Sequence, residues 1–507
     1  MAAKNSPEWW ADRLIAKLSK RKPNLERLER YYDGRVPLAY ATSRFRQEFG
    51  TMLAAINDNW CQVPIGAVDE RLNLDSFRVG TDEDATKRAL EIWAENAMEL
   101  DAQIAHTEAL KLGECHAIVW PSSVQGAAPV ITIESPEHVI VELDPENRSK
   151  RLAAVKAWRD EELGQCATVY LPDGIYKLRR GRKGWEPRQI EGEEYPVENP
   201  WKVVPVVPVA NRPGLSDDSV SDIENILSKQ DMVNKLWADM IIAAEYSAFR
   251  QRWATGVDIP KESGTDATDQ DFMAAVDRLW STAAADAKFG EFDQTDLSVY
   301  VGAIEKLVQH IASQTATPQH YFVSTEQPPS AESLRAAEAP LVAKVRRKQR
   351  IFGAAWAEIM RLALEMDKVT YTGRVSVVWA DPETRTESEH IDAVTKMKSL
   401  DLPTEMLWEM AGLSTADITR AKAMRALDAV TAAMSAPGVG SSASPMQPAD
   451  TPEEIRAMAD AMGVLIRAGA SPESAAARVG LSGLTFTGAI PTSLRPPADQ
   501  ATQLEQV

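Results

Sequence analysis

The sequence predicts an α+β protein that is mainly helical, and three observations support this prediction. Residues 1 to about 120 carry apolar side chains at helical spacing, and two long amphipathic stretches follow after residue 216. Between the N-terminal region and these stretches, residues 117–210 hold short β-rich runs separated by turn signals such as Pro172-Asp173-Gly174. With 507 residues, of which 44% are hydrophobic and 26% charged, the chain is long enough to form several structural regions.

Two helices are expected just before the β-rich region. One covers about 84–96 and the other about 101–112. The second helix should end at Gly113, because glycine adopts the left-handed conformation that closes many helices.

The first long stretch, 216–253, predicts a single helix that would be ~57 Å long. Ser216 can cap it, and the positive end of the helix dipole would favour the acids that follow, Asp217, Asp218 and Asp222. Few globular domains need such a rod. We therefore expect part of its apolar stripe to pack between neighbouring helices or subunits, namely Leu236, Trp237 and Met240.

The second long stretch, 330–366, also predicts a helix, and Pro340 inside it should produce a kink. Its apolar stripe includes Phe352 and Trp356, for which we expect the same kind of packing. Opposite the stripe lies a run of bases without an acid: Lys344, Arg346, Arg347, Lys348 and Arg350. These bases could pair with acids of a neighbour or face water.

The segments around these helices are less regular. Residues 255–295 contain nine acids and three bases, a net charge of −6, and a helix resumes near 296. A loop at 317–329 joins it to the second long helix. Further on we expect a strand at Val375–Trp379, then helices up to about 430, and a linker with a partly disordered tail over 433–507.

The charge balance limits the ways in which the chain can meet DNA. It has 56 Lys and Arg against 74 Asp and Glu, a formal net charge of −18. A protein that holds DNA by neutralising phosphates needs a positive surface, which this balance disfavours. A conduit through which DNA slides is compatible with it, because an acidic wall repels the duplex.

No catalytic or cofactor motif is present. The sequence has no phosphate-binding G-x-x-x-x-G-K-[ST] loop, no H-E-x-x-H and no G-x-S-x-G, so we expect no enzyme, no metal and no cofactor. Its cysteines have no metal-ligand spacing and suggest no disulfide framework. No apolar run approaches the ~20 residues of a membrane span, and the N-terminus lacks the apolar core of a signal peptide, so we expect a product of the host cytoplasm without membrane contact.

Two segments have the composition of nucleic-acid binders. Residues 176–188 form a basic hairpin, which could contact phosphates but more simply serves as a solvated turn or subunit contact. Residues 465–483 have helix-turn-helix spacing, yet Arg478 is the only base in the second helix, which favours a small packing module.

Several stretches resemble phage portal proteins of the siphophage type. TPQHYFVSTEQPPSAESLRAAEAPLVAKVRRKQRIFGAAW, at 317–356, resembles the family's tunnel loop and long kinked helix. DPETRTESEHIDAVTKMKSLDLPTEMLWEMAGLSTADITRA, at 381–421, is similar to the helical segment that follows in the family. Residues 92–120 and 288–315 also resemble it, and the resemblance covers about 1–430.

The resemblance implies a ring subunit, with a dodecamer expected, built of wing, stem, clip, tunnel and crown regions. Onto this chain it places the wing at 1–215, a stem helix at 216–254, the clip at 255–295, a second stem helix at 296–316, the tunnel loop and kinked helix at 317–366, a wing return strand at 367–383 and crown helices at 384–432.

The resemblance also implies function. The ring would lie at the capsid portal vertex of the virion, where DNA is packaged and ejected, and would join head to tail. Its partners would be double-stranded DNA, terminase, major capsid protein, scaffold and a head-tail adaptor. The channel loop would carry Ser324, Thr325, Glu326 and Gln327, and the possible basic belt Lys344, Arg347 and Lys348.

Two other classes of protein fit the sequence less well. A packaging enzyme would need clustered carboxylates for metal ions, whereas the acids here are spread along helix faces. Another head protein, such as a scaffold-like or minor head protein, should be more uniformly helical, without the β-rich body at 117–210.

Overall fold

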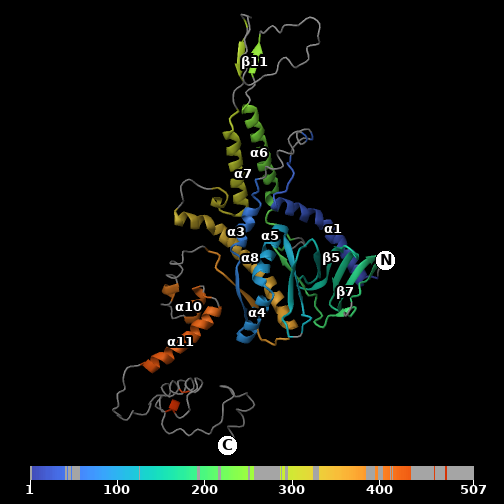
Figure 1. Ribbon diagram of the computed structural model, residues 1–507, viewed down its shortest axis with the longest axis vertical. Helices are drawn as coiled ribbons and strands as arrows, with labels where there is room; N and C mark the ends of the chain where they lie inside the picture. The colour runs from blue at the N-terminus through green and yellow to red at the C-terminus, as the bar shows by residue number, and fades with distance from the viewer. Residues whose placement is uncertain are drawn as a thin grey trace. The chain divides into compact units, whose positions relative to one another are not determined.

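The computed structural model describes residues 3–39, 43, 47, 58–124, 126–190, 194–214, 219–248, 252–255, 286, 288–291, 295–323, 330–383, 394–397, 404–411, 413, 415–435, 462 and 474–476. It is mixed helix and sheet (Figure 1), as the sequence predicts. The chain divides into two compact units, residues 1–419 and 420–507, and nearly all described residues belong to the first.

The N-terminal helices form where capping residues and apolar spacing place them. Helix α1 (Pro7–Tyr32) starts after Ser6, whose hydroxyl accepts a hydrogen bond from the main-chain nitrogen of Trp9. Next come α3 (Gln62–Asp69), α4 (Glu83–Glu95) and α5 (Met98–Leu112). Gly113 ends α5 at a φ of 99°, so the two expected helices and the glycine stop are confirmed within a few residues.

The β-rich region is confirmed as two antiparallel sheets. The smaller has the order β10-β2-β3, and the larger has the order β4-β5-β6-β7-β8 with β9 beside β7. The strands are β2 (Glu114–Trp120), β3 (Val130–Glu134), β4 (Val139–Leu143), β5 (Arg151–Asp160), β6 (Gly164–Tyr170), β7 (Gly174–Gly181), β8 (Gly184–Pro187), β9 (Val197–Glu198) and β10 (Val206–Ala210).

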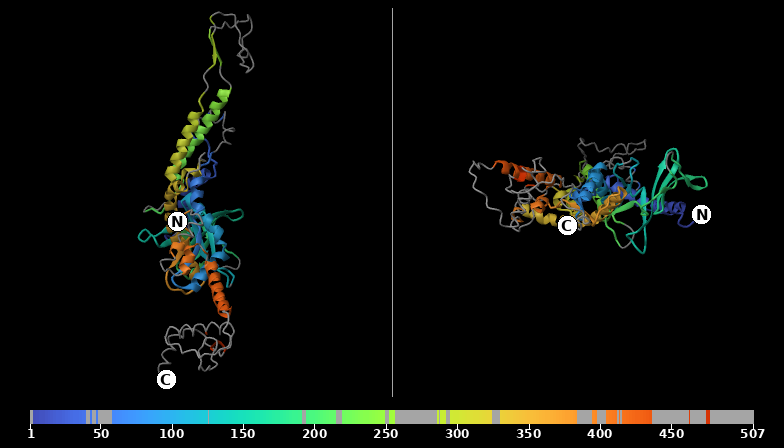
Figure 2. Two further views of the ribbon diagram at one scale, coloured as in Figure 1. Left: turned by 90° about the vertical axis from the view of Figure 1, so that its left-hand side faces the viewer. Right: turned by 90° about the horizontal axis from the view of Figure 1, so that it is seen from below.

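The first long helix is shorter than the sequence predicts. A 3-10 turn at Glu224–Ile226 leads into α6 (Leu227–Ala248), so the helix does not start at Ser216. Residues 219–223 before this turn are not helical, and the Asp222 carboxylate among them accepts a hydrogen bond from the side-chain amide of Asn211. Helix α7 (Ser298–Thr315) lies beside α6 (Figures 1 and 2), and the strands β11 (Arg252–Thr255) and β12 (Lys288–Glu291) pair beyond them.

The second long helix agrees closely with the prediction. A short 3-10 turn, η2 (Gln319–Tyr321), follows α7. Helix α8 (Ala331–Met366) begins after Ser330, whose hydroxyl accepts from the nitrogen of Ser333, and it continues past Pro340. The predicted return strand is β13 (Val375–Trp379), which pairs antiparallel with β1 (Leu74–Val79). Helices α10 (Thr404–Met410) and α11 (Thr415–Ser435) come last.

Two hydrophobic cores hold the first unit together. The larger surrounds α8 and includes residues of α3, α4, α5, β2 and α7. The smaller lies between α1 and the six-stranded sheet, where Leu14 is fully buried. Among the described helices, none has both the length and the apolar character needed to cross a membrane.

Candidate functional site

The most unusual polar feature is a buried ionic cluster at the entry to α6. The carboxylate of Asp222 lies 2.8 Å from the Lys348 ammonium and 2.9 Å from the Lys344 ammonium. The side-chain amide of Asn211 donates to the same carboxylate at 2.8 Å. Lys344 also donates to the main-chain oxygen of Thr315, at the end of α7, at 3.0 Å. The cluster therefore joins β10, the entry to α6, the end of α7 and the middle of α8.

Burial decides the electrostatics of this cluster. Lys348 is only 3% exposed. Burial alone would raise the pKa of Asp222, but the two lysines and the amide donor outweigh it and hold that pKa well below its usual range. Burial lowers the pKa of Lys348 to about 8, although Asp222 opposes that shift. The charged forms of Asp222 and Lys348 are therefore stabilised in the interior by their oppositely charged partners.

These contacts change the interpretation of the basic run. Lys344 and Lys348 point into their own subunit and bind Asp222, so they do not form the exposed belt that the sequence suggested. The helical wheel failed here because an acid from a distant segment draws two of its bases inward. Arg347 is exposed and is the one member of the proposed belt that keeps a free surface.

Two aromatic residues predicted at subunit contacts lie in the subunit's own core. Phe352 and Trp356 are 0% exposed. The Trp356 ring packs edge-on against Trp93 at 5.3 Å, and the imidazole of His106 stacks on Phe352 at 5.2 Å. No surface of either side chain is open to a neighbouring copy, so packing between helices of one subunit is the alternative that fits.

His106 completes this aromatic group. The indole nitrogen of Trp356 donates to its Nε2 at 2.8 Å. Burial lowers the pKa of His106 to about 3, so the ring is neutral and can accept this hydrogen bond. The sequence offered no signal for this contact, because 250 residues separate the two partners.

The predicted residues of α6 lie in a different environment. Leu236, Trp237 and Met240 are half-buried. The indole nitrogen of Trp237 donates to Asp58 Oδ2 at 2.9 Å, and that of Trp60 donates to the same oxygen at 2.8 Å. Asp58 thus holds the Trp237 ring of α6 beside Trp60, while the three predicted side chains stay partly exposed.

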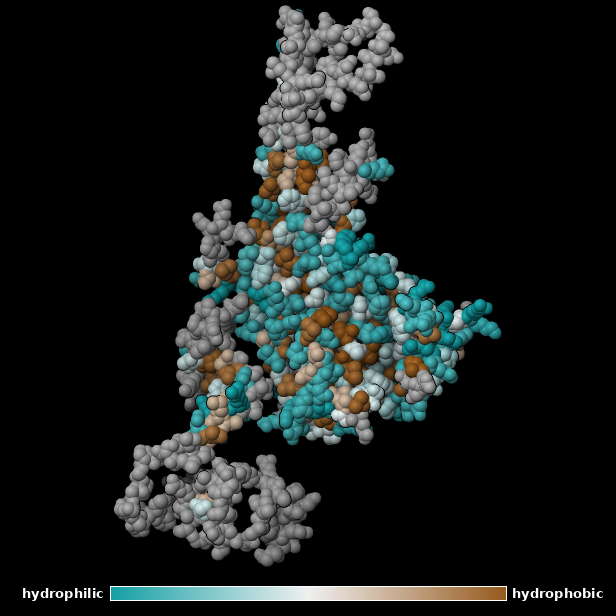
Figure 3. Space-filling model, viewed as in Figure 1, coloured by the Kyte–Doolittle hydropathy of each residue, from teal (hydrophilic) through white to brown (hydrophobic). Residues whose placement is uncertain are grey.

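The apolar surface of the α6–α7 pair extends beyond these residues. Met232, Val299 and Val301 are exposed, Val299 by 68%. Figure 3 shows apolar side chains gathered over the two helices in that view. Such a surface on a described part of the chain is typical of a contact with another protein.

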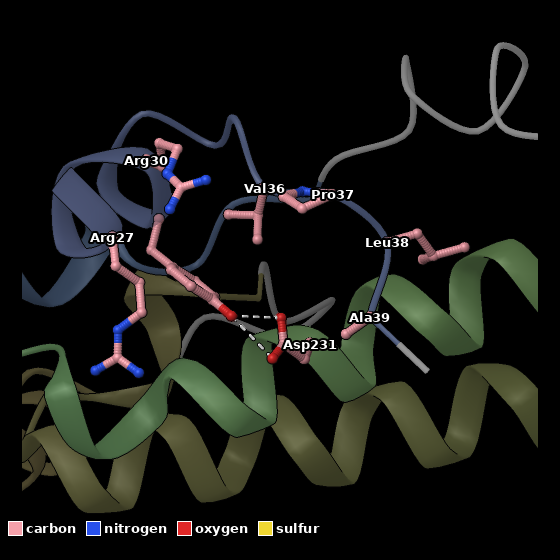
Figure 4. A pocket seen from close by; sticks show the side chains of 8 residues that line it. Arg27, Arg30, Val36, Pro37, Leu38, Ala39 and Asp231 are labelled. Atoms are coloured by element: carbon pink, nitrogen blue, oxygen red, sulfur yellow. Dashed lines mark hydrogen bonds between the residues drawn. The ribbon is translucent and has the colours of Figure 1, made fainter. Parts of the chain in front are cut away.

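A pocket of about 330 Å³ lies where the end of α1 meets α6 (Figure 4). The hydroxyl of Tyr31 donates to the carboxylate of Asp231 at 2.8 Å, and Arg27 and Arg30 stand at its rim. Arg27 pairs with Glu224 at 2.6 Å. The pocket therefore lies between residues that fasten α1 to the base of α6.

The basic hairpin, β7–β8, folds against α1. Arg180 pairs with Asp12 at 2.7 Å, and the indole nitrogen of Trp185 donates to the same carboxylate. One of its bases is therefore neutralised within the subunit. Across the described ranges, no three His, Cys, Asp or Glu side chains are grouped as a metal would require.

Some predicted residues lie outside the part of the chain that the structure describes. They are the channel-loop residues Ser324, Thr325, Glu326 and Gln327, most of the acidic segment 255–295, and the helix-turn-helix-like segment except for 474–476.

Comparison with known proteins shows what this architecture belongs to. Residues 11–429 match the family model described as phage portal protein, SPP1 Gp6-like. The portal protein of Mycobacterium phage L5 is 30% identical over 388 residues, which cover 72% of this chain and 77% of that protein. The portal protein of Mycobacterium phage D29 is 28% identical over 408 residues, covering 76% and 81%. The chain belongs to the phage portal protein family.

Proposed function

We propose that this chain forms the portal ring of a tailed phage, the closed assembly through which DNA enters and leaves the capsid and to which the tail is joined. The observation that carries the proposal is the exposed apolar surface of the paired helices α6 and α7, which include Met232, Val299 and Val301. In a monomer this apolar surface would stay exposed to water, whereas neighbouring copies in a ring would bury it.

Within this proposal, α6 and α7 are the stem and α8 is the tunnel helix. The wing consists of α1, α3, α4 and α5, the two sheets within 114–210 and the β1–β13 pair. The clip at 255–295 and the crown at 384–432 complete the subunit. The role is structural, and the partners are duplex DNA, terminase, major capsid protein, scaffold and a head-tail adaptor. Assembly would take place in the host cytoplasm before the ring becomes part of the virion.

The direct test is the size and shape of the purified protein. Light scattering after size exclusion should give a mass of about a dozen copies, and negative-stain microscopy should show closed rings with an axial hole. Met232→Asp combined with Val299→Asp should shift the protein toward monomers, because the buried charges would oppose contact between copies. Rings that form equally well with this variant would contradict the assigned interface.

The second test concerns the loop between α7 and α8. Its residues Ser324–Gln327 are polar and nearly uncharged, which suits transient hydrogen bonds with a moving duplex. Deleting them should leave rings intact and impair packaging or retention of DNA in complementation of a portal-defective phage. Normal packaging would show that the loop does not act on DNA.

A further inference from the structure

Helix α8 and strand β13 enclose a groove of about 720 Å³ that neither the family assignment nor the proposed ring explains. Its floor on α8 is made of Gly353, Ala354 and Ala357. A Cβ atom added to Gly353 would lie only 3.0 Å from the indole nitrogen of Trp379, so a larger residue at position 353 would displace the Trp379 ring. The lack of a side chain at Gly353 thus lets the Trp379 ring pack against α8 beside the groove.

The walls of the groove are positively charged. Arg346 and Arg350, one helical turn apart on α8, face it together with Arg374 at the start of β13. Arg346 pairs with Glu383 at 2.7 Å and with Asp381 at 3.5 Å. Arg350 and Arg374 have neither an ion pair nor a side-chain hydrogen bond to any residue that the structure describes. In a chain with a net charge of −18, two unpaired arginines that line the same groove are a local exception.

Strand β13 also has an open edge. It belongs to a two-stranded sheet in which β1 covers one side, and no described strand lies on the other. The carbonyl of Arg374 accepts from the nitrogen of Gly80, and the nitrogen of Ala380 donates to the carbonyl of Asn73. Because alternate residues of an antiparallel strand face its partner, the main-chain groups of Val375 and Val377 point to the uncovered side.

We propose that this groove binds an extended acidic segment of a partner protein, which adds to β13 as a third strand. Main-chain hydrogen bonds to the open edge would give affinity, as in other cases of strand addition. Acidic side chains of the segment would pair with Arg350 and Arg374, and its backbone would lie in the groove along β13. The proposal goes beyond ring formation, since it assigns a docking site on each subunit.

The test uses a synthetic peptide of about nine residues in which valine or threonine alternates with glutamate. Its fluorescence anisotropy is followed on titration with the purified full-length protein. Binding should be saturable and should weaken as salt is added. Arg350→Glu combined with Arg374→Glu should weaken it by about tenfold or more, a loss of ~1.4 kcal/mol. The matched control, Arg347→Glu, reverses the charge of an exposed arginine on the same helix outside the groove and should bind as before.

A second measurement separates strand addition from simple charge attraction and needs no protein variant. The same peptide, N-methylated at alternate residues, keeps its charges but loses the main-chain donors that would pair with β13. It should no longer bind. The proposal is overturned if the methylated peptide binds as well as the original, if a lysine-containing version binds equally, or if assembled rings bind no peptide. Light scattering measures ring formation independently, so a failure of peptide binding can be distinguished from a failure of ring assembly.

Discussion

The two long helical regions, α6 and α8, have similar sequence patterns and opposite environments. Each has an apolar stripe with aromatic residues and charges on the other face. In α8 the stripe is enclosed by its own subunit, Lys348 is buried as well, and Lys344 is partly buried. In α6 the stripe is covered on one side by α7 and otherwise stays partly exposed. An amphipathic pattern therefore shows that a helix has a buried face, but not whether its own chain or a second copy buries it.

The largest effect is expected in the enclosed half of α8. Trp356→Ala should lower the free energy of unfolding by ~3–5 kcal/mol, because it leaves a cavity in the core and removes a hydrogen bond to buried His106. Chemical denaturation of the protein would measure the change. Trp237→Ala is the matched substitution on α6, and its cost should be clearly smaller because that ring is only half-buried. If both variants lost the same free energy of unfolding, the proposed difference in burial between α6 and α8 would be wrong.

The next effect concerns the ionic cluster. Asp222→Ala should lower the free energy of unfolding by ~3 kcal/mol, since Lys344 and Lys348 would lose their shared anion while Lys348 stays buried. Adding Lys348→Met should recover part of this loss, because the second change removes the uncompensated charge. A double variant that is less stable than Asp222→Ala would show that Lys348 contributes through other contacts.

Acid sensitivity should also arise from the enclosed region. Burial lowers the pKa of His106 to about 3 and that of His116 to about 4. The unfolded chain would bind protons near pH 6.5 while the folded chain would not, so stability is full above that pH and falls as pH drops. Between pH 6.5 and 5 the loss should be ~2 kcal/mol for each ring. His106→Gln should flatten this slope in denaturation curves, and an unchanged slope would exclude His106 as its source.

The sequence predicted the secondary structure more accurately than it predicted the contacts between distant residues. Apolar side chains at helical spacing located α8, and Gly113 located the end of α5, because these signals act within a few residues. The start of α6 was wrong because Asp222 was interpreted as a local dipole partner, whereas it binds lysines more than 100 residues away. Pairings of that kind depend on tertiary structure, and nothing in a single sequence marks them. The same limit explains why the basic belt was overestimated.

The smallest change in the free energy of unfolding is expected for Arg347, an exposed residue of the otherwise enclosed helix α8. Because this side chain faces solvent, Arg347→Ala should change the free energy of unfolding by no more than ~0.5 kcal/mol. Lys348→Ala, one residue along, removes a buried ion-pair partner and should cost several times more. If Arg347 faces passing DNA, its loss should alter packaging in a salt-dependent way, since a phosphate contact releases counterions. Packaging that responds equally to both alanine variants would mean that subunit stability, and not charge facing the duplex, controls the process.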